Sequence, residues 1–124
     1  MFPISETSPV QFRPPLPDLC DTVVIGGGVI GVMTAWHLAK AGQTVVLCEK
    51  GRIAGEQSSR NWGWVRQLGR DPAELPIAME ANRIWQDLAK ECGEDLGFRQ
   101  TGVLYLANKA GDMAGFENWL QFAK

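Results

Sequence analysis

Residues 22–49 read TVVIGGGVIGVMTAWHLAKAGQTVVLCE, and the order of residue types in this stretch decides the fold. The opening TVVI predicts a short strand, and the three glycines that follow predict a tight turn. Residues 29–41 have a helical pattern, Gly42 stands where a helix end favours positive φ, and residues 44–48 predict a second, buried strand. Strand, helix and strand in this order predict a βαβ unit with parallel strands.

The glycines have the spacing Gly26-x-Gly28-x-x-Gly31 between the first strand and the helix. Gly26 allows the tight turn, Gly28 lets the backbone approach a diphosphate, and Gly31 lets the helix pack on the strand. The diphosphate would lie at the positive end of the helix. Glu49 ends the second strand, where its carboxylate would accept hydrogen bonds from an adenosine ribose and repel the 2′-phosphate of NADP. The complete pattern predicts a site for FAD or NAD.

An irregular loop follows Glu49 and carries polar residues suited to a cofactor. Residues 50–71 show no regular period, and loops of this length inside a domain usually have a function. The serines, Arg60 and Asn61 supply donors for a diphosphate and for flavin carbonyls, and Gly63 allows backbone contact with a flat ring. Arg60 is alternatively a solvated surface charge, and the two tryptophans of the loop are either core residues or walls of the ring site.

Residues 49–64, EKGRIAGEQSSRNWGW, resemble the flavin loop of the D-amino-acid oxidase superfamily, which includes glycine oxidase, sarcosine oxidase and D-amino-acid dehydrogenases. Residues 101–106, TGVLYL, resemble the first substrate-domain strand of that family, so the resemblance spans residues 21–124. It implies an α/β fold, with a Rossmann-like FAD-binding βαβ unit as the N-terminal part of a two-domain flavoenzyme. It also implies an FAD-dependent oxidoreductase that oxidises the C–N bond of an amino acid or amine by hydride transfer to FAD.

The cofactor-binding residues predicted from the motif and the resemblance lie in the glycine turn, at the end of the second strand and in the loop. They are Gly26, Gly28, Val29, Ile30, Gly31, Glu49, Lys50, Ser58, Ser59, Arg60, Asn61, Trp62, Gly63 and Trp64. No catalytic residue is assigned, because the substrate-binding segments of the family would lie beyond residue 124. Solvated charges or a helix cap explain Arg66, Arg70 and Asp71 equally well.

Three segments are predicted along the chain. Residues 1–20 form a proline-rich arm, residues 21–97 the first part of an FAD-binding domain, and residues 98–124 the incomplete start of a substrate domain. Asp71 and the prolines after it mark the start of an amphipathic helix of about four turns. Its apolar face consists of Ile77, Ala81, Ile84, Trp85, Leu88, Ala89 and Cys92. A strand over residues 103–107 and a final amphipathic stretch complete the prediction.

Composition argues against several classes of protein. A net charge of −2 without a Lys/Arg cluster disfavours nucleic-acid binding. Three cysteines and the single His37 have no metal-ligand or disulfide spacing, which fits a reduced, cytoplasmic compartment. Residues 1–19 carry acids and five prolines where a signal peptide needs a basic start and an apolar core. No apolar stretch is long enough for a transmembrane helix.

One βαβ unit with one extra strand cannot complete a doubly wound sheet, so we expect the front part of a longer protein, inactive by itself. The sheet face left open predicts marginal stability, self-association or a partner subunit. Two other functions stay open at this point. The chain is alternatively the front half of an NAD-dependent dehydrogenase, or a small non-catalytic nucleotide-binding subunit of a multi-subunit dehydrogenase.

Overall fold

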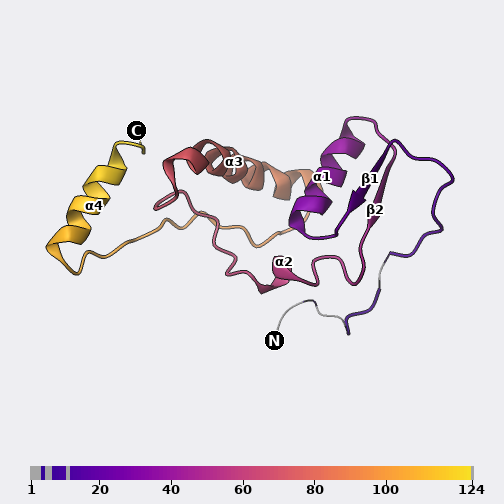
Figure 1. The fold of residues 1–124 in the computed structure, drawn as a ribbon, viewed down its shortest axis with the longest axis horizontal. Coiled ribbons are helices and arrows are strands. Elements are labelled where there is room, and N and C mark those ends of the chain that lie inside the picture. The colour runs from indigo at the N-terminus through magenta and orange to yellow at the C-terminus, as the bar shows by residue number, and fades with distance from the viewer. Residues whose placement is uncertain (1–3, 5–6, 11, 124) are drawn as a thin grey trace. The chain divides into compact units, whose positions relative to one another are not determined.

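A computed structural model describes residues 4, 7–10 and 12–123, and the chain divides into two compact units, Met1–Gly63 and Trp64–Lys124 (Figure 1). The first unit contains β1 (Thr22–Ile25), α1 (Val29–Lys40), β2 (Val45–Cys48) and α2 (Gln57–Arg60). The second unit contains the 3-10 helix η1 (Pro72–Glu74), α3 (Leu75–Cys92) and α4 (Ala110–Leu120).

The first unit is the predicted βαβ unit. β1 and β2 are parallel neighbours, in a register that runs from Thr22 opposite Val45 to Ile25 opposite Cys48. α1 connects them and lies beside the two strands (Figure 1). Gly42, just after α1, has a φ of +87°, a left-handed conformation that glycine adopts without a steric penalty. The α/β fold class and the order of its elements are therefore confirmed.

The turn from β1 into α1 requires glycine for two different reasons. Gly26 has a φ of +107°, which other residues rarely adopt. A Cβ on Gly31 would lie 1.9 Å from the carbonyl oxygen of Gly26, and a Cβ on the buried Gly27 would lie 2.5 Å from Ile53 Cδ1. The start of α1 can therefore lie directly on the turn only because these side chains are absent.

The second unit contains the predicted long helix, with recognisable signals at both ends. The Asp71 side chain accepts a hydrogen bond from the Ala73 amide (2.9 Å) where η1 begins. Gly93 ends α3 with a φ of +69°, as expected for a left-handed C-cap. Asp71 thus satisfies a free amide of η1, which leads into α3, and Gly93 provides the left-handed turn at the end of α3.

The predicted apolar face of α3, from Ile77 to Cys92, is covered in its middle and exposed at its two ends. Leu75 and Leu88 are buried. The central members of the predicted face are half-buried, namely Ala81, Ile84, Trp85 and Ala89. Trp85 stacks on Phe98, with ring centroids 6.1 Å apart. Ile77 stays 76% exposed, and Cys92 is exposed as well, so the covered stripe is shorter than predicted.

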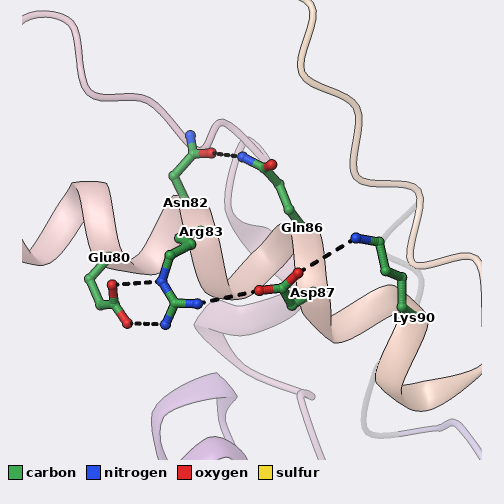
Figure 2. Close-up of polar contacts among 6 residues, drawn as sticks. All are labelled: Glu80, Asn82, Arg83, Gln86, Asp87 and Lys90. Carbon is green, nitrogen blue, oxygen red and sulfur yellow. Dashed lines mark hydrogen bonds and ion pairs between the residues drawn. The ribbon is translucent and has the colours of Figure 1, made fainter.

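The polar face of α3 carries a chain of ion pairs along the helix (Figure 2). The Arg83 guanidinium contacts Glu80 through two hydrogen bonds (2.5 and 3.0 Å) and Asp87 at 3.3 Å. Asp87 in turn lies 3.6 Å from Lys90 Nζ. Each pair is exposed and spaced three or four residues apart, so each stabilises the helix only weakly.

The strand predicted over residues 103–107 is not formed. Val103 and Tyr105 are half-buried while Leu104 and Leu106 are exposed, so the alternation typical of a strand is present. A strand also needs a hydrogen-bonded neighbour, and among the described residues only β1 and β2 pair. Side-chain packing holds the segment instead, because the Tyr105 ring lies 5.9 Å from that of Phe116.

Gly31→Ala tests the close approach at the turn. We expect the substitution to destabilise the intact protein by about 1–3 kcal/mol or to prevent folding, because the new methyl group would overlap a backbone carbonyl that cannot move aside cheaply. Gly115→Ala is the matched control, since a Cβ there meets nothing within 4 Å inside α4. Urea unfolding followed by circular dichroism would measure both, and a Gly31→Ala protein as stable as the parent would contradict the packing described.

The Asp95–Arg99 pair predicts that the stability of the fold depends on pH. Two hydrogen bonds from Arg99 (3.0 and 2.8 Å) and one from the Gly97 amide (2.8 Å) lower the pKa of Asp95 from 3.8 to about 2. A depressed pKa in the folded state means that this carboxylate stabilises the fold above pH 3.8, and that its contribution is lost as the pH falls through about 2.

An NMR titration of the Asp95 carboxyl carbon would measure that pKa directly. Asp95→Asn should lower the unfolding midpoint at pH 6, and the difference from the parent should disappear near pH 2. An Asp95 carboxyl that titrates near 3.8 would show that Arg99 does not pair with it in solution.

Candidate functional site

Glu49 lies beside the glycine turn, where the end of β2 meets the start of α1. Its carboxylate accepts one hydrogen bond from the Gly27 amide and one from the Gly51 amide, each 2.7 Å long. These two amides, that of Gly27 first, lower the pKa of Glu49, so the group is a carboxylate at neutral pH. A carboxylate oxygen accepts more than one hydrogen bond, so the half-buried Glu49 retains capacity for hydroxyl donors.

Ser58 is the loop residue that the structure brings to the glycine turn. Its hydroxyl oxygen accepts a hydrogen bond from the Val29 amide (2.7 Å), the first amide of α1. A Cβ on Gly28 would lie 3.2 Å from that oxygen. The amides of Ile30 and Gly31 donate to no atom of the described residues, as is usual for a helix start. An oxygen-rich ligand would therefore find backbone donors and a hydroxyl together here.

The loop is tied to the turn at a second place that the sequence did not reveal. The Ala54 amide donates to the Gly27 carbonyl (2.8 Å), and Ala54 has a φ of +59°, unusual for a residue other than glycine. A buried Gly55 follows it. An alanine followed by a glycine does not indicate such a contact in a sequence, because the contact depends on the path of the loop.

Other predicted loop residues form hydrogen bonds that shape the loop itself. The Asn61 side chain donates to the Ser58 carbonyl (2.6 Å) and accepts from the Gly63 amide (2.7 Å), and Gly63 has a φ of +64°. Ser59 Oγ lies 3.2 Å from the Glu56 carbonyl, and Arg60 forms an ion pair with Glu56 at 3.3 Å. These side chains therefore bind backbone and side-chain groups within residues 56–63 and hold the short helix α2 and the turn after it.

The remaining predicted residues are exposed or belong to the second unit. Lys50 and Trp62 are exposed, Trp62 to 90%. Trp64 begins the second unit, where the Arg66 guanidinium lies 5.0 Å from the centre of its ring. Arg66 also donates to the Leu68 carbonyl, and Arg70 pairs with Glu74 at 3.4 Å.

A cavity of about 310 Å³ lies next to Glu49. Its wall consists of Glu49, Lys50, Gly51, Arg52, Gly55 and Glu56. The sequence prediction included the first two of these residues and missed the others. Arg52 and Glu56 place opposite charges in the wall, beside a carboxylate that can bind hydroxyl groups.

The arrangement fits the adenosine and diphosphate parts of a dinucleotide. A diphosphate needs donors and a backbone without a Cβ, which the start of α1 and Gly28 provide. A ribose needs an acceptor for its hydroxyls, which Glu49 provides. Within the described ranges, no three His, Cys, Asp or Glu side chains are grouped closely enough to hold a metal ion. No helix among those residues has the length and apolar character required to cross a membrane.

Known proteins resemble this chain over most of its length. Sarcosine oxidase subunit beta of Arthrobacter sp is 38% identical over 95 residues, which are 75% of this chain and 24% of that protein. The mitochondrial pyruvate dehydrogenase phosphatase regulatory subunit of Mus musculus is 33% identical over 93 residues, 74% of this chain and 11% of that protein. An L-amino acid deaminase structure from Proteus vulgaris has a TM-score of 0.86 at 30% identity, covering 94% of this chain and 30% of that one.

The chain thus spans less than a third of each of these relatives. Residues 21–124 match the family described as DAO, FAD dependent oxidoreductase. The matched range includes the glycine turn, Glu49 and the whole loop. The chain belongs to the FAD dependent oxidoreductase family.

Proposed function

We propose that these residues bind the adenosine and diphosphate parts of FAD in a flavoenzyme that oxidises the C–N bond of an amino acid or amine. The observation that carries the proposal is the meeting of Glu49, Ser58 and the start of α1 at one glycine turn. Two of the relatives support the substrate class, since they are named for sarcosine oxidation and for amino acid deamination. Family membership favours FAD over the NAD alternative.

In this proposal each group has a distinct part. The α1 amides and the Ser58 hydroxyl hold the diphosphate, and the missing Cβ of Gly28 makes room for it. Glu49 accepts hydrogen bonds from the ribose, while the Gly27 and Gly51 amides hold its carboxylate in place. When bound, FAD would supply the redox chemistry, as the acceptor of a hydride from the carbon that bears the amine. Residues 60–63 extend the site toward the ring.

The proposal extends to organisation and location. Residues 1–20 are an arm, residues 21–97 the first part of the FAD-binding domain, and residues 98–124 the start of a substrate domain. The free Cys20, Cys48 and Cys92 support a cytoplasmic location. The proposal also includes self-association or a partner subunit, either of which would bury exposed strand residues such as Val23 and Ile25.

A second candidate function is nucleotide binding without catalysis. The relative from Mus musculus is named as a regulatory subunit, although it shares this part of the fold. A purified intact protein that contains FAD and reduces it with sarcosine or other amino acids would support the enzyme. A protein whose bound FAD is reduced by no amine or amino acid would favour the second candidate.

Gly28→Val tests the diphosphate site. We expect the purified intact protein to contain little or no FAD, because the added methyl groups would occupy the space beside Ser58 that the diphosphate needs. Gly111→Val is the control, since a Cβ there meets nothing within 4 Å. Absorbance at the flavin bands gives the FAD content, and the thermal midpoint of the apoproteins shows whether the loss is selective. A normal flavin content in Gly28→Val would contradict the assignment.

Glu49→Ala tests the ribose contact. We expect FAD binding to weaken by about 1–3 kcal/mol, because charge-assisted hydrogen bonds to the ribose hydroxyls are lost. Substrate oxidation at saturating FAD should persist. Fluorescence titration of the deflavinated protein measures the dissociation constant, with Glu117→Ala as a control for the loss of an exposed glutamate. An unchanged constant would show that Glu49 serves only to fasten the glycine turn.

A further inference from the structure

The N-terminal arm is attached to the loop that carries α2. Arg52 Nε donates a hydrogen bond to the Ser8 carbonyl, and Ser59 Oγ lies 3.2 Å from the Ile4 carbonyl. Both arm atoms belong to the backbone, and both partners are side chains of the loop. The arm precedes residue 21, where the match to the family begins.

The two loop residues that contact the arm lie next to the candidate site. Arg52 forms part of the cavity wall beside Glu49 and also donates to the Gly51 carbonyl at 3.2 Å. Ser59 is adjacent to Ser58, whose hydroxyl oxygen accepts a hydrogen bond from the first amide of α1. The arm therefore contacts the loop at both ends of the segment that closes over the glycine turn.

Polar contacts, more than apolar packing, hold the arm in this position. Between these contacts and β1 the large apolar side chains Phe12, Leu16 and Leu19 are exposed to 71%, 76% and 89%, whereas Ile4 is half-buried. Prolines at 14, 15 and 17 restrict the backbone between the contacts and β1, which reduces the entropy lost when the arm is fixed. Removing the contacts at residues 4 and 8 should thus release the arm without opening a core.

We propose that the arm is a strap that holds the loop over residues 52–59 against the glycine turn and thereby tightens the retention of FAD. The inference rests on the proposed FAD site and assigns Arg52 as a positioning residue. A loop already held in its binding conformation loses less entropy when the cofactor binds, so its affinity is higher.

A double-mutant cycle on the intact, deflavinated protein tests the strap. The variants are a deletion of residues 1–8, Arg52→Ala, and both together, with Arg13→Ala as the control for an exposed arginine of the same arm. We expect the deletion and Arg52→Ala each to raise the dissociation constant of FAD about three- to tenfold, the range for losing one or two hydrogen bonds to an exposed loop. The double variant should bind no more weakly than the deletion alone, whereas Arg13→Ala should match the parent.

Hydrogen exchange in the apoprotein provides a readout that does not depend on FAD. The Ala54 and Val29 amides, bonded to Gly27 and Ser58, should exchange faster once the arm is deleted, while those of β1 and β2 should not change. Unchanged exchange together with unchanged FAD affinity in the deletion variant would overturn the strap, as would fully additive effects in the cycle. A parent protein that binds no FAD at all would overturn the proposed function itself.

Discussion

The hydrogen bond from the Gly27 amide to the Glu49 carboxylate, 2.7 Å long, joins the end of β2 to the turn between β1 and α1. It can form only because the turn lacks side chains, since a Cβ on Gly27 would already lie 3.0 Å from Glu49 Cβ. The Gly27 carbonyl accepts a hydrogen bond from the Ala54 amide. The backbone amide of Gly27 therefore binds the end of β2, and its carbonyl binds the loop that follows. The close packing of this turn therefore fixes the positions of β2, α1 and the loop in the first unit.

The same turn sets the electrostatic character of the candidate site. α1 has no acidic residue in its first turn, and its first amide is capped by the neutral hydroxyl of Ser58. The first turn of α1 itself therefore carries no negative charge against the positive end of the helix dipole. Glu49 next to this turn keeps its own charge, which the Gly27 and Gly51 amides stabilise. A ligand with anionic and hydroxyl groups matches both features.

The second unit depends on local contacts to a greater degree. Its long helix follows the capped 3-10 helix η1, ends at the left-handed Gly93, and has ion pairs three or four residues apart on its exposed face. Its non-helical segments are held by aromatic rings and by single hydrogen bonds, such as that from the Trp119 indole to the Arg70 carbonyl (2.9 Å). Buried apolar residues are few among those described, namely Leu75 and Leu88. Leu104 and Leu106 are exposed.

The sequence by itself determined the βαβ unit and the helix α3, because both depend on local signals: glycine spacing, β-branched runs, helical period and end caps. The tertiary structure decided which of several chemically similar loop residues reaches the glycine turn. Ser58 and Ser59 are adjacent and identical, yet one caps α1 and the other faces the arm. It also decided that residues 103–107 stay unpaired, although their alternation is that of a strand. Both outcomes depend on partners distant in the chain, and a pattern of neighbouring residues contains no information about them.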